Sequence, residues 1–182
     1  RTLHERRTRI GIRTVELRRT DVTDAQGGEF LFVVNGRPIY CRGTNHVPLD
    51  ALHSRDSEHV GRVLPMLVDL NCNMVRCWGG NVYEDHGFFG FCDEHGIMVW
   101  QDFAMACCIY PQTPSFAERI RVEAEAVVRK LRNHPSLVLW AGNNEIDQAY
   151  RWSSLGVDPN SDIHSRQVLP DVVRRLDPRR PY

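Results

Sequence analysis

Two hydrophobic periods alternate along this chain, and together they predict a series of strands and helices. Near the amino end, apolar and polar residues alternate over residues 10–17, as in a half-buried strand. A second extended segment, residues 30–34, leads into Asn35-Gly36, a strong hairpin signal, and residues 38–43 follow as the returning strand. The polar residues 21–28 indicate a loop between the first two strands.

From residue 60 onward, the pattern changes to helices and strands in turn. Apolar residues three and four positions apart predict helices over 60–68, 88–92, 115–131 and 168–176. Short apolar runs predict strands at 73–78, 97–100 and 137–140. With residues 38–43 as the first, four strands alternate with four helices. This order predicts an α/β fold with a parallel sheet and right-handed crossovers.

Local signals set the expected helix ends. Pro65 should kink the first helix, and Gly96 should end the second. Ser115 and Glu118 have the spacing of a capping box, which predicts the start of the third helix. Asp177-Pro178 should end the last one.

Composition excludes several classes of protein. The 182 residues carry 23 basic and 23 acidic side chains, so the formal net charge is zero. This balance removes the general electrostatic argument for binding nucleic acid or an anionic membrane surface. No apolar run approaches the roughly 18 residues that a membrane span requires. We therefore expect a globular domain whose partner is neither nucleic acid nor membrane.

The six cysteines show neither a C-x-x-C pair nor the spacing of a metal site. We interpret them as reduced thiols, with Cys41, Cys77 and Cys92 packed in apolar surroundings. We accordingly expect no metal and no cofactor. Reduced thiols and a chain that starts without a secretory signal favour the cytoplasm, although a chain without an initiator Met can be a piece of a longer one.

The candidate site follows from the predicted sheet, because function in a parallel α/β sheet lies just past the carboxyl ends of the strands. Those positions hold Asn45-His46, Arg76 with Trp78, Asp102, and Asn144-Glu145. Singly, each group has a structural explanation: a carboxylate can cap a helix, and Arg76 can neutralise Asp102 or Glu84. Together, polar and aromatic groups after four successive strands suit a polyhydroxylated ligand, with indole faces available to stack on a sugar.

The ordered motifs resemble family 2 glycoside hydrolases, particularly the β-mannosidase-like branch. The matching segments are residues 32–39, 42–45, 73–84, 92–103 and 134–145, and the resemblance covers the chain from about Gly11 to its end. The resemblance implies that residues 1–28 are the tail of an immunoglobulin-like β-sandwich. Residues 29–182 would then be the N-terminal half of a catalytic (β/α)8 TIM barrel, with about four βα units.

The resemblance also implies retaining hydrolysis of a terminal β-linked sugar by two carboxylates. Glu145 matches the acid/base, Asn144 the residue that hydrogen-bonds the sugar 2-hydroxyl, and Arg76 an arginine that orients the nucleophile. Trp78, Asp102 and Asn45 would line the pocket for the terminal sugar. The nucleophile of the family follows strand seven, so we expect this chain to be a fragment that is inactive alone. We also expect self-association through its open sheet edges.

Departures from the family pattern leave alternatives open. His46 stands where an aromatic residue is common, and the loop of residues 78–81 reads Trp-Gly-Gly-Asn where a third glycine is common. Mannose is therefore preferred over galactose, glucuronate or glucosamine without excluding them. A non-catalytic carbohydrate-binding or scaffold module also stays open. An α/β nucleotide-binding protein is disfavoured, because the chain lacks both glycine-rich phosphate motifs.

Overall fold

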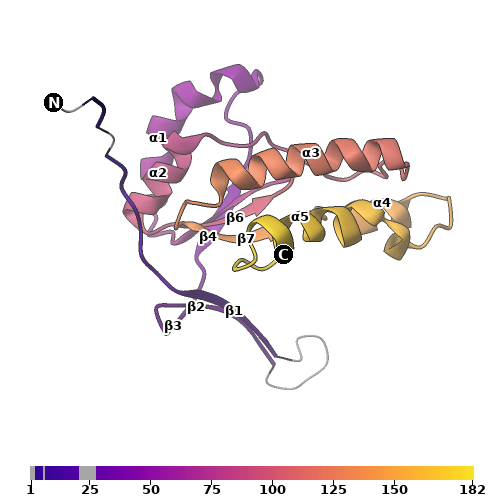
Figure 1. Cartoon of the computed structure of the whole chain (residues 1–182), viewed down its shortest axis with the longest axis horizontal. Coiled ribbons are helices and arrows are strands. Elements are labelled where there is room, and N and C mark those ends of the chain that lie inside the picture. Colours follow the sequence, from indigo (N-terminus) through magenta and orange to yellow (C-terminus); the bar gives the residue numbers. More distant parts are fainter. Residues whose placement is uncertain (1–2, 6, 21–27) are drawn as a thin grey trace.

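A parallel sheet covered by helices on one face, with an antiparallel layer at one end, makes up the structure (Figure 1). The computed structural model describes residues 3–5, 7–20 and 28–182; the loop expected at 21–28 lies almost entirely outside this part of the chain. The parallel sheet contains, in sequence order, β4 (Gly43–His46), β5 (Met74–Cys77), β6 (Met98–Asp102) and β7 (Leu137–Ala141). The α/β class and the parallel sheet are thereby confirmed, and the arrangement is consistent with part of a TIM barrel.

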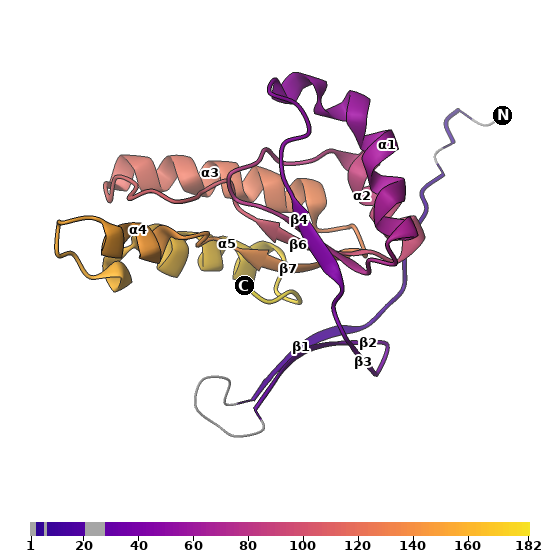
Figure 2. The same ribbon diagram turned by 180° about the vertical axis from the view of Figure 1, so that it is seen from behind.

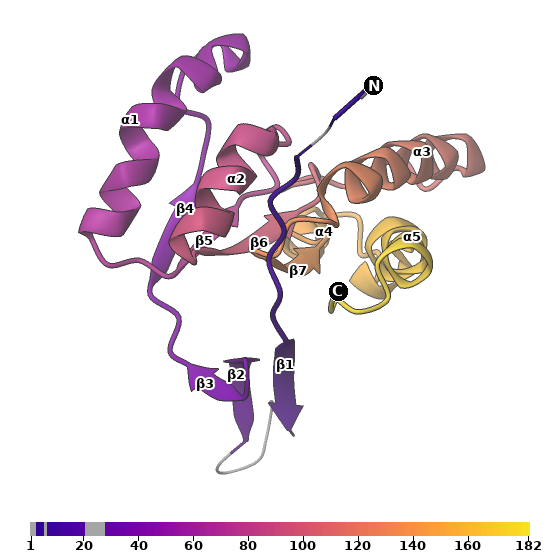
Figure 3. The ribbon, with the colours of Figure 1, turned by 60° about the vertical axis from the view of Figure 1, so that its left-hand side comes forward.

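Helices follow each parallel strand and share one core with the outward-facing strand residues (Figure 3). They are α1 (Asp56–Asp69), α2 (His86–His95), α3 (Pro114–Leu131), α4 (Ile146–Trp152) and α5 (Leu169–Leu176), with a π-helical turn (His164–Val168) leading into α5. Phe88 of α2 and Val128 of α3 are completely buried against Val99 and Trp140 of the sheet. The seven-residue α4 is not among the predicted helices.

The antiparallel layer lies at the amino end of the parallel sheet, away from the helices (Figure 2). It consists of β1 (Val15–Thr20), β2 (Glu29–Val34) and β3 (Arg37–Ile39). The predicted hairpin turn is confirmed, since Asn35 and Gly36 both have positive φ (+50° and +77°), as a tight two-residue turn requires. Phe32 packs on Met98 and Leu139, so this layer buries the inner face of the sheet at its amino end.

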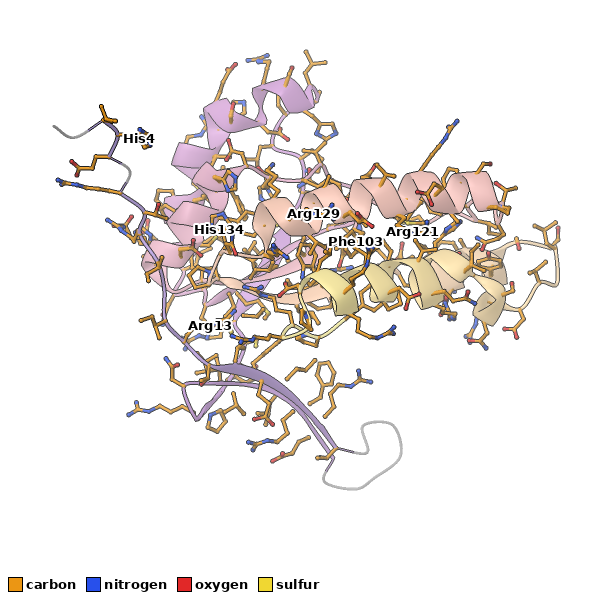
Figure 4. The ribbon with its side chains drawn as sticks, viewed as in Figure 1. His4, Arg13, Phe103, Arg121, Arg129 and His134 are labelled. Carbon is orange, nitrogen blue, oxygen red and sulfur yellow. The ribbon has the colours of Figure 1, made fainter. Side chains whose placement is uncertain are left out.

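Two strand predictions were wrong in their bounds. Residues 10–14 do not form a strand, and β1 begins at Val15. Apolar and polar residues alternate there, but the apolar Ile10 and Ile12 are exposed and bury no strand face. The Arg13 side chain (Figure 4) donates to the carbonyls of Pro135 and Leu137 (2.9 Å each).

Residues 38–43 are not one strand either, because β3 belongs to the antiparallel layer and β4 to the parallel sheet. The Asn73 side chain bridges the break: it accepts from the Arg42 N–H (2.8 Å) and donates to the Tyr40 carbonyl (2.9 Å). These contacts satisfy backbone groups where the chain passes from one sheet to the other.

Helix ends agree with the sequence in part. The predicted stop at Gly96 is confirmed, with φ at +68°. The capping box at Ser115 was wrong: Thr113 caps α3 by accepting from the Phe116 N–H (3.3 Å), and Pro114 occupies the first turn, which suits proline. Pro65 lies inside α1, which continues to Asp69, and the kink expected there stays a prediction.

All six cysteine thiols are free, and their environments differ. Cys77 and Cys92 are completely buried, and burial raises the pKa of Cys92 to about 12, so both are inert packed thiols. The expectation that Cys41 is packed was wrong, since that residue is exposed.

Candidate active site

Arg76 is the centre of a polar cluster at the carboxyl end of the parallel sheet. Its Nη2 atom donates to Asp102 Oδ2 (2.7 Å) and to Asn144 Oδ1 (2.8 Å), and its Nη1 atom lies 3.4 Å from Asn45 Oδ1. The guanidinium also lies over the indole of Trp100, 4.7 Å from the ring centroid. One arginine on β5 therefore joins residues from all four parallel strands or their ends.

Asp102 is almost fully buried, with 1% of its side chain exposed. Besides Arg76, the Gly79 N–H donates to Asp102 Oδ2 (3.0 Å). Gly79 is required at this position, because a Cβ there would lie 2.6 Å from the Met105 carbonyl oxygen. Burial raises the pKa of Asp102 above its ordinary value, while Arg76 and the Gly79 N–H act in the opposite direction. Asp102 is thus a carboxylate held by the scaffold, with little contact with solvent.

Asn144 and Glu145 follow β7 and differ in exposure. Asn144 is buried and fixed by Arg76, whereas the Glu145 side chain is exposed at the edge of the cluster. Glu145 has a left-handed backbone (φ +54°, ψ +20°), which is uncommon for a residue other than glycine and occurs often at functional sites. Its Oε2 atom accepts a hydrogen bond from the Cys107 thiol (2.9 Å).

The structure brings five of the six predicted site residues into one network. Asn45, Arg76, Asp102 and Asn144 are linked directly, and Glu145 joins through Cys107. The sixth, Trp78, follows β5 with a half-buried indole beside Gly80. Among the described residues, no hydrogen bond joins its side chain to the others, so its role stays a prediction.

Sequence reasoning missed two members of the site. Trp100 stacks under Arg76 from the neighbouring strand, and its place two residues before Asp102 on an alternating strand was the signal that could have found it. Cys107 lies on the loop after β6, at the same edge of the sheet as the other candidates but beyond the last residue of its strand, Asp102. Interpreting the six cysteines only as reduced thiols, without a place in the site, concealed it.

His46 and Glu84 form a separate buried pair (Nε2 to Oε1, 2.7 Å) beside Phe88. The pair ties the end of β4 to the loop before α2. The sequence allowed either Asp102 or Glu84 as the acidic partner of Arg76. In the structure, Arg76 pairs with Asp102, whereas Glu84 pairs with His46.

Within the part of the chain that the structure describes, no three His, Cys, Asp or Glu side chains gather closely enough to hold a metal ion. Likewise, none of the described helices combines the length and apolar character needed to cross a bilayer.

Comparison with known proteins places these observations in a family. The model of the TIM barrel domain of glycosyl hydrolases family 2 matches residues 26–182. The β-mannosidase of Rattus norvegicus is 42% identical over 156 residues, which are 85% of this chain and 18% of that protein. The β-mannosidase B of Neosartorya fischeri is 39% identical in an alignment of 190 positions, gaps included, which covers 97% of this chain and 22% of that protein.

Solved structures of similar proteins share the fold of this chain. The crystal structure of a β-D-mannosidase from Dictyoglomus thermophilum superimposes with a TM-score of 0.86 at 42% identity, over 95% of this chain and 22% of that one. A β-glucuronidase of Parabacteroides merdae superimposes with a TM-score of 0.75 at 22% identity, over 95% of this chain and 20% of that one, a likeness of fold alone.

The fold and site thus define a domain of the TIM barrel class with a polar cluster at the carboxyl ends of its strands. The chain belongs to glycosyl hydrolases family 2, within the TIM barrel domain. It spans about a fifth of the length of the curated relatives that it matches.

Proposed function

We propose that the protein containing this chain is a retaining glycoside hydrolase that releases a terminal β-linked sugar, with Glu145 as acid/base. The observation that carries the proposal is the position of Glu145, exposed at the end of β7 beside a buried, fixed Asn144. The strand-end amides and carboxylate suit the hydroxyl groups of a sugar, and the Trp100 ring supports Arg76 beside them.

Each residue has a distinct role in the proposed mechanism. The nucleophile carboxylate attacks the anomeric carbon while Glu145 transfers its proton to the departing glycosidic oxygen, which leaves as an alcohol. Glu145, now ionised, then takes a proton from water as the water oxygen attacks the anomeric carbon and the nucleophile leaves. Asn144 would hydrogen-bond the 2-hydroxyl, and Asn45 and Asp102 would bind other hydroxyls of the same sugar.

Arg76 would orient the nucleophile. Its Nε atom and the Oδ1 atom of Asp102 are buried without a hydrogen-bond partner among the described residues. Buried polar atoms are nearly always paired, so unsatisfied atoms in a polar cluster support a ligand or a further chain segment at this place. A nucleophile carboxylate beside Arg76 would satisfy the free donor.

Mannose is the preferred sugar, because the relatives at about 40% identity are named β-mannosidases. The structures named β-glucuronidases share about 22% identity, which supports a common fold and no choice of sugar.

We further propose that the chain is the first half of the barrel and that the nucleophile lies outside it. In support, β4 and β7 end the parallel sheet, and neither has a second strand neighbour among the described residues. We keep the proposed division into the tail of an immunoglobulin-like domain (1–28) and the half barrel (29–182). The pairing of β1 with β2 across that boundary means that the two parts share a sheet.

Open sheet edges should drive the isolated chain to self-associate. Light scattering on the purified 182-residue chain should show a dimer or larger species without glycosidase activity. A stable, active monomer would contradict the half-barrel proposal.

The proposed role of Glu145 is tested in the native polypeptide that contains this chain. Glu145→Gln should lower kcat/KM for β-mannosides with poor leaving groups by about 10²- to 10⁴-fold, because such groups depart only when protonated. Asp147→Asn is the matched control: Asp147 lies two residues along the chain and pairs with Arg166 outside the cluster, so turnover should not change. Wild-type turnover by Glu145→Gln would refute the assignment.

A further inference from the structure

A continuous chain of hydrogen bonds leads from Arg76 to Glu145 through Cys107. Arg76 Nη2 donates to Asn144 Oδ1 (2.8 Å), Asn144 Nδ2 donates to Cys107 Sγ (3.5 Å), and Cys107 Sγ donates to Glu145 Oε2 (2.9 Å). The contact with Arg76 requires the amide oxygen of Asn144 to face the guanidinium, so its NH2 group must face the sulfur. Every donor in the chain therefore points toward Glu145.

The backbone holds Cys107 in the same place. Its N–H donates to the Asn144 carbonyl (2.9 Å), and Ala106 forms a parallel bridge with Asn144, so the loop after β6 is fastened to the end of β7. Cys107 and Glu145 both have φ of +54°, although neither is glycine. Such backbone conformations persist where the surroundings enforce them, and they concentrate at functional sites.

Cys107 keeps the proton that it donates, because the hydrogen bond with Glu145 raises the pKa of its thiol. A thiol is also a weak donor. It can hold one carboxyl oxygen both when Glu145 is ionised and when the proton sits on the other oxygen. An N–H or O–H donor would favour the ionised form more strongly, which would oppose the acid role.

We propose that Cys107 is a positioning residue for Glu145: its thiol holds Oε2, so that Oε1 exchanges the proton with the leaving oxygen and then with water. This inference rests on the proposed role of Glu145 as acid/base. It assigns the loop after β6 a part in catalysis without direct contact with the sugar.

The test uses the native polypeptide and two β-mannosides, one with a poor alkyl leaving group and one with an activated aryl leaving group. Cys107→Ala should lower kcat/KM about tenfold for the alkyl substrate, which corresponds to about 1.4 kcal/mol. The activated substrate needs less protonation, so its kcat/KM should stay within about twofold of wild type. Cys107→Ser retains a donor and should recover part of the loss, and the recovery should stay incomplete because the stronger O–H donor favours the ionised form of Glu145.

Cys108→Ala is the matched control, because Cys108 is equally exposed and its thiol faces the Ile109 carbonyl at 3.6 Å instead of Glu145. It should leave both rates unchanged. If Cys107→Ala does not fold, Cys107→Gly, which suits the positive φ, replaces it with the same expected loss.

Equal losses on both substrates, or no loss, would overturn the role of Cys107. Glu145→Gln is measured in parallel to separate the two proposals. If Glu145→Gln abolishes alkyl turnover while Cys107→Ala has no effect, only the inference about Cys107 fails. If Glu145→Gln turns over the alkyl substrate normally, the proposed function itself fails.

Discussion

The two ends of the parallel sheet are built from the same strands and differ in kind. At the carboxyl end, Arg76 gathers Asp102, Asn144 and Asn45 around one guanidinium. At the amino end, Met98 and other apolar residues are covered by the antiparallel layer. One strand, β6, contributes Met98 to the apolar end and Asp102 to the polar end, only four residues apart.

Along each strand, the residues at the amino end contribute mainly to stability, and those at the carboxyl end form the candidate site. Apolar burial at the amino end stabilises the fold through area removed from water. The carboxyl end buries a carboxylate at a free-energy penalty, which the partly satisfied arginine and the Gly79 N–H offset. Left-handed backbones at residues other than glycine concentrate at functional sites, and here Cys107 and Glu145 both have one.

The largest effect on stability is expected at the amino end. Phe32→Ala should lower the free energy of unfolding by about 3–5 kcal/mol, since Phe32 is 5% exposed and fills the space between the two sheets. Phe30→Ala on the same strand is the control, because Phe30 is 59% exposed and should change little. Chemical denaturation measures both. Turnover per folded molecule of the native polypeptide should not change with Phe32→Ala, and a specific loss would contradict the separation.

A somewhat smaller loss is expected at the carboxyl end for Arg76→Ala. Removing the guanidinium leaves Asp102 buried without its charge partner, which should lower the free energy of unfolding by about 3 kcal/mol. Arg174→Ala, which breaks an exposed ion pair with Asp171, should have almost no effect. Denaturation of the two variants side by side measures the difference. Unlike Phe32→Ala, Arg76→Ala should also abolish turnover. If Arg76→Ala and Arg174→Ala were equally stable, the ion pair of Arg76 with Asp102 would contribute nothing to the free energy of unfolding.

The smallest effect is a pH dependence that belongs to Asp102 alone. Its pKa is raised in the folded state, chiefly by burial, so the folded protein binds this proton more tightly than the unfolded chain does. The contribution of Asp102 to stability should therefore be greatest below the ordinary pKa of 3.8 and should fall as the pH rises through the folded pKa.

Asp102→Asn cannot ionise and should lose this part of the pH dependence, so the difference in unfolding free energy between wild type and variant should change with pH just above 3.8. Urea denaturation over that range measures the difference. A difference that is constant with pH would contradict the burial of a charged Asp102.

The sequence could predict the elements and the edge at which the site lies, because periodicity and strand ends are local properties. It located Arg76, Asp102, Asn144 and Glu145 at adjacent strand ends, and the structure joins them. It could not predict that β3 leaves the sheet of β4, since that break depends on Asn73 from a distant part of the chain.

It also could not distinguish Cys107 from the packed cysteines. The Cys107 thiol differs from an inert one because it is hydrogen-bonded to Glu145, 38 residues away in the sequence. That contact depends on the loop after β6 being held against the end of β7. Exposure and partner, rather than residue type, decide the role of each cysteine.

We propose that Glu145, at the polar end, is the acid/base of a retaining enzyme. Turnover of an activated aryl β-mannoside by the Glu145→Ala variant of the native polypeptide, with and without azide, tests this role. Azide attacks a glycosyl-enzyme without needing a general base, so it should accelerate turnover and yield a β-glycosyl azide, the product of two inversions. An azide without effect, or an α-glycosyl azide formed by a single displacement, would contradict the claim.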